Sequence, residues 1–230
     1  MAKVLRMEPL PGYDPEVGRW LWALEEVRRR TFGLVEGLDW RTLDWEGPDG
    51  RENAVGSLLY HIAMAEMSWL FLDIQEEEFP PAVRADFPYP MSDGEGRLTR
   101  VLDVPLAEHL GRLERSRAIL LKAFRGMLPD EWRRPRHPGD VDYEVTPEWA
   151  VFHLVEHEAG HAFQISSLKA RVARFFASQP DGKMRLCRGP SPTPARLRDG
   201  LLKPLYATSR RSLMTPTSTI VAQQERFEDR

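Results

Sequence analysis

Three histidines at steps of four residues are the most distinctive chemical feature of this sequence. His153, His157 and His161 lie in the stretch 153–161, which holds half of the six histidines in the chain. A step of four in an α-helix turns the side chain about 40° past a full circle, so all three fall within one narrow stripe. Imidazole is the commonest metal ligand, and two at this spacing can converge on one ion about 2 Å from each nitrogen. The spacing predicts a metal site, with histidines along a polar edge of the core as the simpler alternative.

The rise of the helix limits which histidines can share an ion. His153 and His161 would lie about 12 Å apart along the axis, which is too far for one ion. The pair is therefore either His153 with His157 or His157 with His161, and a third ligand must come from elsewhere. The spacing alone does not choose between the two pairs.

Residues 157–161 also read as H-E-x-x-H, the pattern of the zinc-peptidase helix. In such enzymes a third ligand lies downstream, but no glutamate follows Glu158 before Glu225. The extended form of the motif fails at Gln164 and Ser167. A zinc hydrolase is therefore kept only as an alternative.

Composition and charge indicate a folded domain with no general attraction to nucleic acid or membrane. The 230 residues, 42% hydrophobic and 29% charged, are enough for one domain with a real core. The net charge of −3 gives no pull toward nucleic acid, and no apolar run is expected to reach the ~20 residues of a membrane span. The single Cys187 excludes an internal disulfide and suits a reducing compartment. With no signal peptide at the N-terminus, we expect a cytoplasmic protein.

Periodic apolar residues and capping signals predict four long helices and no convincing β-strand. Asp14-Pro15 and Thr146-Pro147 each place a capping side chain before a proline at the first helical position. Residues 75–102, rich in proline and glycine, form a long crossover that could act as a lid. The fold class is all-α, a four-helix bundle with at least one long crossover. The helices are expected over residues 14–38, 53–74, 106–128, where Pro129 ends the third, and 146–176.

The charge balance changes near Ser178. Residues 178–230 hold ten Lys and Arg against five Asp and Glu, a net of +5, and six of the 19 prolines, whereas residues 1–177 carry −8. Such a composition cannot bury enough apolar surface to offset its ordering entropy. We predict a helical domain over 1–177 and a basic, proline-rich, disordered tail over 178–230.

His61 is the expected third ligand. It interrupts an apolar face of the second helix that includes Leu58 and Ile62. Alone, such a residue would be read as a core histidine bonded to a backbone carbonyl, but facing two other histidines it becomes a natural ligand. His109, expected to lie exposed on the flank of the third helix, and His137, in a loop, have no partner at helical spacing and receive no metal role.

Two segments resemble the DinB-like family: 58–63 on the second helix and 157–165 on the fourth. The resemblance implies a four-helix bundle that holds a divalent metal through three histidines, one on the second helix and an HxxxH pair on the last. Carried over, these ligands are His61, His157 and His161.

The resemblance is incomplete around the second ligand pair. Many members read HxxHHRGQ here, whereas this chain has Gly160 in place of the first paired histidine and Ala162-Phe163 in place of Arg-Gly. Gln164 is kept, and His153 occupies a position that is often histidine in the family. The departures leave the subfamily open.

The resemblance also implies chemistry with a low-molecular-weight thiol. Relatives include mycothiol- or bacillithiol-dependent S-transferases and a maleylpyruvate isomerase. Three imidazoles would leave a zinc, nickel or iron ion with an open position, where it could lower the pKa of a thiol. The expected function is a metal-dependent transferase or isomerase with a small-molecule substrate. The alternatives are a zinc hydrolase and a non-enzymatic bundle that binds a metal or a partner.

Roles for the remaining residues near the ligands follow from helix geometry. Glu156 and Glu158 point about 100° away from the ligand stripe, so no general base is assigned. His153 and Gln164 are expected to support the ligands from outside the coordination shell. Trp69 and Phe163 are expected to line a cavity between the second and fourth helices. No nucleic-acid or membrane partner is expected, and a homodimer is left open.

Overall fold

The computed structural model describes residues 2, 4–93, 96–139 and 141–178, and this part of the chain is helical. Its β-structure is limited to two isolated bridges, one of which joins Arg136 to Val145. Residues 179–230 of the predicted tail lie outside the described residues. The long helices are α1 (Pro15–Val35), α3 (Val55–Met67), α5 (Leu106–Phe124) and α7 (Pro147–Ala177), and α3 continues directly into the π-helix η1 (Ser68–Ile74). The short helices α2 (Trp40–Leu43), α4 (Pro81–Asp86) and α6 (Pro129–Trp132) lie in the connections.

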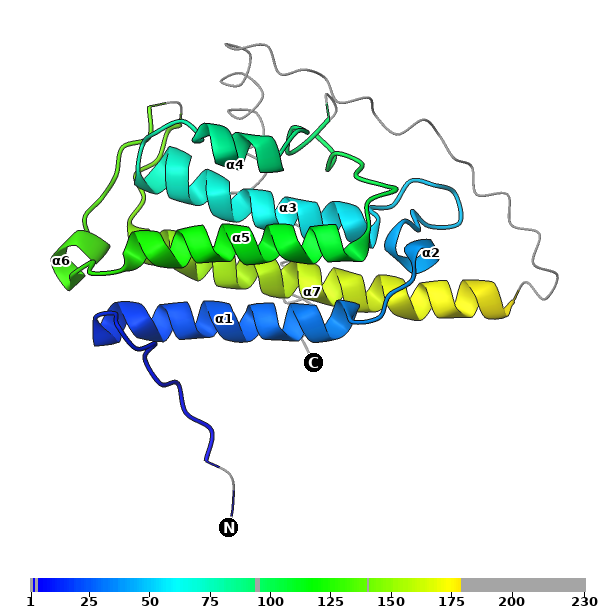
Figure 1. Ribbon diagram of the computed structural model, residues 1–230, viewed down its shortest axis with the longest axis horizontal. Helices are drawn as coiled ribbons and strands as arrows, with labels where there is room; N and C mark the ends of the chain where they lie inside the picture. Colours follow the sequence, from blue (N-terminus) through cyan, green and yellow to red (C-terminus); the bar gives the residue numbers. More distant parts are fainter. Residues whose placement is uncertain (1, 3, 94–95, 140, 179–230) are drawn as a thin grey trace, which may run out of the picture.

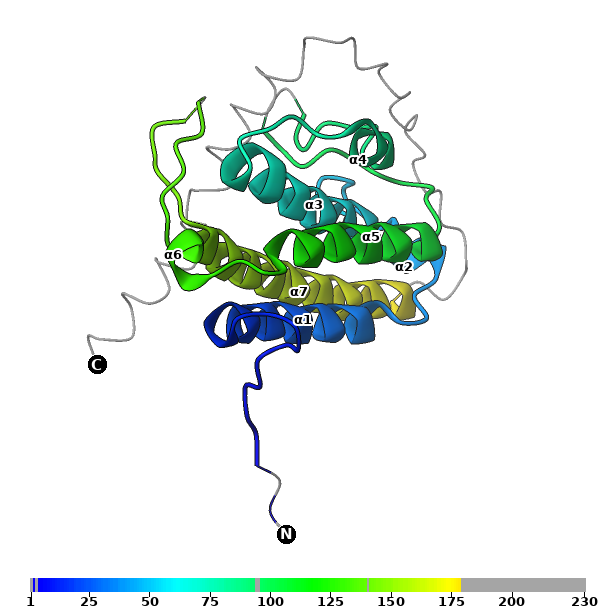
Figure 2. The ribbon, with the colours of Figure 1, turned by 60° about the vertical axis from the view of Figure 1, so that its left-hand side comes forward.

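The four long helices pack side by side around a common core (Figure 1). α1 contacts α7, α7 contacts α3, α3 contacts α5, and α5 returns to α1. α1 and α7 run in one direction, and α3 and α5 run in the other (Figure 2). Because α3 and α5 are parallel neighbours, the chain between them must travel back along the bundle. The all-α class is confirmed, and the arrangement is compatible with the predicted bundle with one long crossover.

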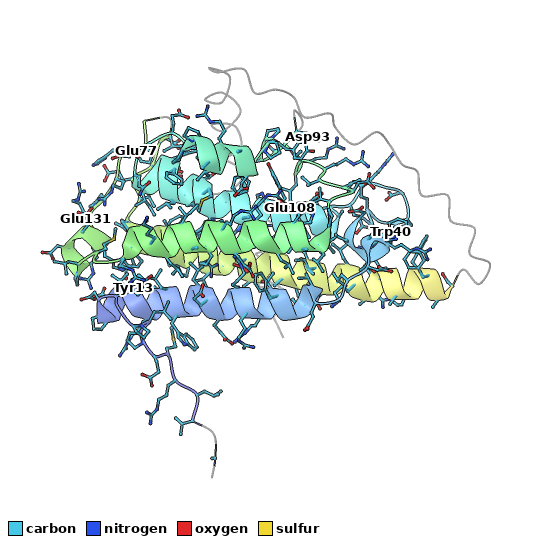
Figure 3. The ribbon with its side chains drawn as sticks, viewed as in Figure 1. Tyr13, Trp40, Glu77, Asp93, Glu108 and Glu131 are labelled. Carbon is cyan, nitrogen blue, oxygen red and sulfur yellow. The ribbon has the colours of Figure 1, made fainter. Side chains whose placement is uncertain are left out.

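Contacts at one end of the molecule confirm these directions. The hydroxyl of Tyr13, just before α1, donates to the carbonyl of Leu121 near the end of α5 over 3.0 Å. Trp20 of α1 packs edge-on against Phe152 of α7, with ring centroids 5.9 Å apart, so the starts of these two helices adjoin. Figure 3 shows Tyr13 at this end of the molecule and Trp40 of α2 at the other.

The predicted starts of the first and last helices are confirmed by their caps. The side chain of Asp14 accepts a hydrogen bond from the backbone N–H of Glu16, and the side chain of Thr146 accepts one from Trp149. Each cap satisfies a donor that the first turn leaves without a helical partner, and the proline that follows each cap needs none.

The end of the third helix differs from the prediction. α5 ends at Phe124, and Gly126 then adopts a φ of 79°, which turns the chain out of the helix. Pro129 does not stop α5 but begins the short helix α6. The proline ring suits this first position, because the missing N–H would have no helical partner there.

α3 is the central helix, and every residue in it is buried. It meets α5 and α7, and the hydroxyl of Tyr60 bonds Tyr89 of the crossover. Contrary to expectation, Val55–Ile74 is long and apolar enough to cross a membrane by length and composition, but 94% of its most apolar stretch of 18 residues is buried inside the protein. A helix that is apolar all round is what burial on every side requires.

The close approach of α3 and α5 depends on Gly56. A Cβ there would lie 3.0 Å from Nε2 of His109 and 3.1 Å from the carbonyl oxygen of Val101. The missing side chain leaves room for the imidazole, and His109 is only 1% exposed. The expectation that His109 lies exposed on the flank of its helix is therefore wrong.

The crossover between η1 and α5 is packed rather than open. It contains α4, and Tyr60 of α3 donates to the carbonyl of Tyr89 over 2.7 Å. Arg115 of α5 pairs with Asp86 at 2.8 Å. The helix α4 of this segment lies on the side of α3 away from α7 (Figures 1 and 2). Among the described residues of the crossover, the buried apolar side chains are Phe79, Val83, Phe87, Met91 and Val101.

Candidate metal centre

The three predicted ligands meet in the seam between α3, which carries His61, and α7, which carries the other two. Nε2 of His157 lies 2.9 Å from Nε2 of His61 and 3.1 Å from Nε2 of His161. One ligand atom from each residue lies within 4.8 Å of the others. An ion bound at about 2.0–2.1 Å in tetrahedral geometry separates its nitrogen donors by about 3.3 Å, so this spacing fits a single ion. The structure thus brings together His157 and His161 rather than His153 and His157.

The protonation of these imidazoles suits metal ligands. Burial lowers the pKa of His61 and His157 well below the ordinary 6.5, and the neighbouring His161 lowers both further. Burial also lowers the pKa of His161, although Gln164 and Glu158 oppose this shift. The three rings are therefore neutral at pH 7, and each can offer a lone pair without first losing a proton.

Gln164 selects the tautomer of His161. Its Oε1 lies 3.1 Å from Nδ1 of His161. An amide oxygen can only accept, so Nδ1 carries the proton and Nε2 keeps its lone pair for a ligand. The Nδ1 atoms of His61 and His157 are buried and have no hydrogen-bond partner within the described residues. Three neutral nitrogens that face one point form a donor set suited to a divalent transition metal.

His153 lies beside this donor set but is not part of it. Its ring stacks on Trp149 at 4° with centroids 5.2 Å apart, and it lies 5.8 Å from the ring of His157. Burial lowers its pKa to about 4. Its buried Nε2 has no partner among the described residues. His153 is thus a neutral aromatic neighbour of the ligands, and its supporting role stays a prediction.

The two residues predicted to line a shared pocket lie in different settings. Trp69, in the first turn of η1, is 1% exposed and packs against His153, with centroids 5.0 Å apart. Phe163 is 77% exposed on α7. It follows His161 by two residues, which turns it about 200° around the helix and away from the seam. Trp69 can therefore border the site, whereas Phe163 does not form a wall inside the bundle.

Glu158, the glutamate of the H-E-x-x-H pattern, is engaged elsewhere. It is 1% exposed, and its carboxylate accepts from Nε of Arg28 at 2.8 Å and from Nη2 of Arg117 at 3.1 Å. A carboxylate held by two guanidinium groups is not placed to take a proton from a reactant at the histidines. The geometry therefore does not favour the zinc-hydrolase alternative.

A second polar cluster, which the sequence reasoning missed, lies next to the histidines. We call Arg28, Glu66, Arg117 and Glu158 the four-helix charge cluster, because each long helix contributes one member and none is more than 5% exposed. Burial favours a lower pKa for Arg28, but Glu66 and Glu158 raise it above its usual value. Burial favours a higher pKa for Glu66, but the two arginines lower it below its usual value. Glu66 is the one charged residue in the apolar run 55–72, and this was the sequence signal that could have indicated a buried charge cluster.

Comparisons with known proteins give the family. Residues 23–165 match the model of the DinB superfamily, and this segment contains all three histidines and the four-helix charge cluster. The uncharacterised protein YkkA of Bacillus subtilis (strain 168) is 24% identical over 160 residues, which cover 67% of this chain and 87% of YkkA. Because the family model covers more than half of the chain, the protein belongs to the DinB superfamily.

Proposed function

We propose that this protein binds one divalent transition-metal ion through His61, His157 and His161 and uses it to activate a low-molecular-weight thiol. The thiol would then attack, or assist the isomerisation of, a small electrophile. The observation that carries the proposal is the position of His157 Nε2, 2.9 Å and 3.1 Å from the Nε2 atoms of His61 and His161. Zinc, nickel and iron all suit such nitrogen ligands.

The donor set determines what chemistry the ion could supply. Held by three neutral imidazoles, an ion would keep its +2 charge and an open position, where it would lower the pKa of an incoming thiol. The protein's own part is to hold these lone pairs in place, with Gln164 fixing the proton on Nδ1 of His161. The chain's single cysteine, Cys187, lies outside the matched segment, so we expect the thiol to come from a cofactor.

The aromatic side chains near His157, one of which is exposed, favour a small organic reactant. Trp149 is 39% exposed and stacks on His153, and Trp69 packs behind both rings with its centroid 5.5 Å from that of Trp149. Flat aromatic faces bind apolar and conjugated groups well. A cytoplasmic location, expected from the sequence, would keep the thiol reduced.

The proposal is tested by incubating the metal-loaded protein with mycothiol, bacillithiol or glutathione and a panel of small electrophiles. We expect conjugation or isomerisation faster than the uncatalysed rate with at least one thiol, and loss of this acceleration in His157→Ala. His137→Ala is the matched control, because His137 is exposed and pairs with Glu144 rather than with a ligand. No acceleration with any thiol at full metal occupancy would reject the thiol chemistry and leave the binding alternative.

A further inference from the structure

The two helices that carry the metal ligands also carry both acids of the four-helix charge cluster. Glu66 follows His61 by five residues on α3, and Glu158 directly follows His157 on α7. Both arginines come from the other two helices. We propose that the cluster fixes the position of α3 along its axis relative to α7. Glu66 and Glu158 are then positioning residues for the metal centre. This inference rests on the metal binding proposed above.

Arg28 connects α1 to the three other long helices. Its Nε and Nη2 donate to the two oxygens of Glu158 over 2.8 Å and 3.2 Å. This bidentate contact fixes the orientation of the two side chains as well as their distance. The same Nη2 donates to Oε1 of Glu66 over 2.9 Å. Nη1 donates to the carbonyl of Leu113 on α5 over 2.6 Å. One guanidinium group therefore holds α3 and α7 at defined positions.

Arg117 makes the same connections from α5. Its Nε donates to Oε1 of Glu66 over 2.8 Å, and its Nη2 donates to Oε2 of Glu158 over 3.1 Å. Its Nη1 donates to the carbonyl of Leu24 on α1 over 2.9 Å. Ser116 adds a bond from its hydroxyl to Oε2 of Glu66 over 2.7 Å. Both carboxylates are thus held by both arginines, and neither ligand-bearing helix can slide without breaking charged hydrogen bonds.

A metal site needs this directional control. Apolar contacts are not directional, so they allow small slides of one helix along another. A metal site, in contrast, needs its ligand distances within about 0.2 Å. Glu66 lies about 7.5 Å along the axis from His61, and Glu158 lies about 1.5 Å from His157, so each helix is held close to its ligands.

Metal affinity separates this role from a purely structural one. When more than about 99% of the protein is folded, a loss of stability alone hardly changes its affinity, because affinity scales with the competent fraction. Misplaced ligands, in contrast, weaken binding even in a fully folded protein. The visible absorption of bound Co²⁺ reports the ligand geometry independently of affinity.

The experiment measures Zn²⁺ affinity by competition with a chromophoric chelator, and Co²⁺ absorption at saturation, on the full-length protein. Glu158→Gln and Glu66→Gln remove one charge each. A fourfold variant, Arg28→Met, Glu66→Leu, Arg117→Met and Glu158→Leu together, replaces the cluster with apolar side chains of similar volume, a change that often preserves folding. Glu26→Gln is the matched control, because Glu26 pairs with Arg29 and Arg30 on the exposed face of α1.

We expect each Gln variant and the folded fourfold variant to bind Zn²⁺ about 10–100-fold more weakly and to change the Co²⁺ spectrum. This is the loss typical of replacing residues that orient metal ligands. Glu26→Gln should match the unmodified protein. Unchanged affinity and spectrum in the folded variants would overturn the positioning role, since apolar packing would then align the ligands. If the fourfold variant does not fold, the two Gln variants decide. Failure of the unmodified protein to bind either ion would instead reject the metal site itself.

Discussion

His157 and Glu158 are neighbours in the sequence, yet they belong to polar clusters of opposite character. His157 faces two other neutral imidazoles, and its buried Nδ1 has no partner within the described residues. Glu158 lies in a cluster in which each carboxylate is held by both arginines. A satisfied buried cluster holds a fold together, whereas imidazole lone pairs that converge on one point indicate a metal site.

Helix geometry lets one segment of α7 supply both clusters. Adjacent residues point about 100° apart, so His157 can face α3 while Glu158 turns toward Arg28 of α1 and Arg117 of α5. His161 returns to the direction of His157 one turn later. The H-E-x-x-H pattern here therefore joins a candidate binding site to the structural centre of the bundle rather than supplying a peptidase base.

The largest effect on stability should come from breaking the satisfied cluster. Glu66→Ala leaves Arg28 with Glu158 as its acidic partner, and Arg117 with Glu158 and the partly exposed Glu25. Removing one partner from a buried ion network costs about 3–5 kcal/mol, because the remaining charge stays desolvated. Urea unfolding of the metal-free protein measures this loss. His157→Ala, in the unsatisfied cluster, should cost less, and an equal or larger loss there would reverse the comparison.

His109 is a buried histidine without hydrogen-bond partners in the described part of the chain that lies outside the metal site, and its burial should affect stability rather than metal binding. Both of its ring nitrogens lack partners within the described residues, but it does not belong to the converging group of histidines. Burial, and then the charge of Arg112, lowers its pKa to about 4. The unfolded chain takes up a proton near pH 6.5, whereas the folded protein does so only near pH 4. Stability should therefore fall as the pH drops through this window.

The contribution of His109 is on the order of 3 kcal/mol, from a pKa difference of about two and a half units. Urea unfolding at pH 7 and pH 4 should show that His109→Leu loses less stability on acidification than the unmodified protein. The other buried histidines act in the same direction, so the difference between the two proteins isolates His109. Equal pH dependence in both would show that its burial carries no such cost.

A smaller effect is expected from removing the support of one ligand. Gln164→Leu should weaken Zn²⁺ binding about tenfold, because nothing then holds the proton of His161 on Nδ1. Gln164→Glu keeps an accepting oxygen at the same reach and should bind Zn²⁺ at least as well as the unmodified protein. Chelator competition distinguishes the two variants. Equal Zn²⁺ affinities of Gln164→Leu and Gln164→Glu would mean that this hydrogen bond does not set the tautomer of His161.

The smallest effect should come from His153. His153→Phe keeps the stack on Trp149 and the contact with Trp69 but removes both ring nitrogens. Because His153 lies outside the donor group, Zn²⁺ affinity should change by less than about threefold. Elimination of binding by this substitution would make His153 a direct ligand.

The caps and the helical stripe were accessible from the sequence because they depend on local spacing. Asp14 and Thr146 start their helices as predicted, and the position of His61 in an apolar run placed it inside the bundle. The identity of the buried arginine was not accessible. Arg28, Arg29 and Arg30 are consecutive in the sequence, and only the packing of α1 shows that the first is buried.

Other differences arise from contacts between distant segments. His109 is covered because Gly56 of α3 leaves room for its ring. The crossover packs against α3 through its aromatic residues, with the Phe87 ring 5.6 Å from that of Tyr60. Periodicity along one segment does not contain this information, since it reports which face is apolar and not what covers that face.

The most direct test of the metal centre is elemental analysis of the purified full-length protein beside a variant with His61→Ala, His157→Ala and His161→Ala together. We expect about one equivalent of a divalent transition metal in the unmodified protein and almost none in the variant, with similar helical circular dichroism for both. Stoichiometric metal retained by the triple variant, or no uptake by the unmodified protein in the presence of excess zinc, nickel or iron, would contradict the account.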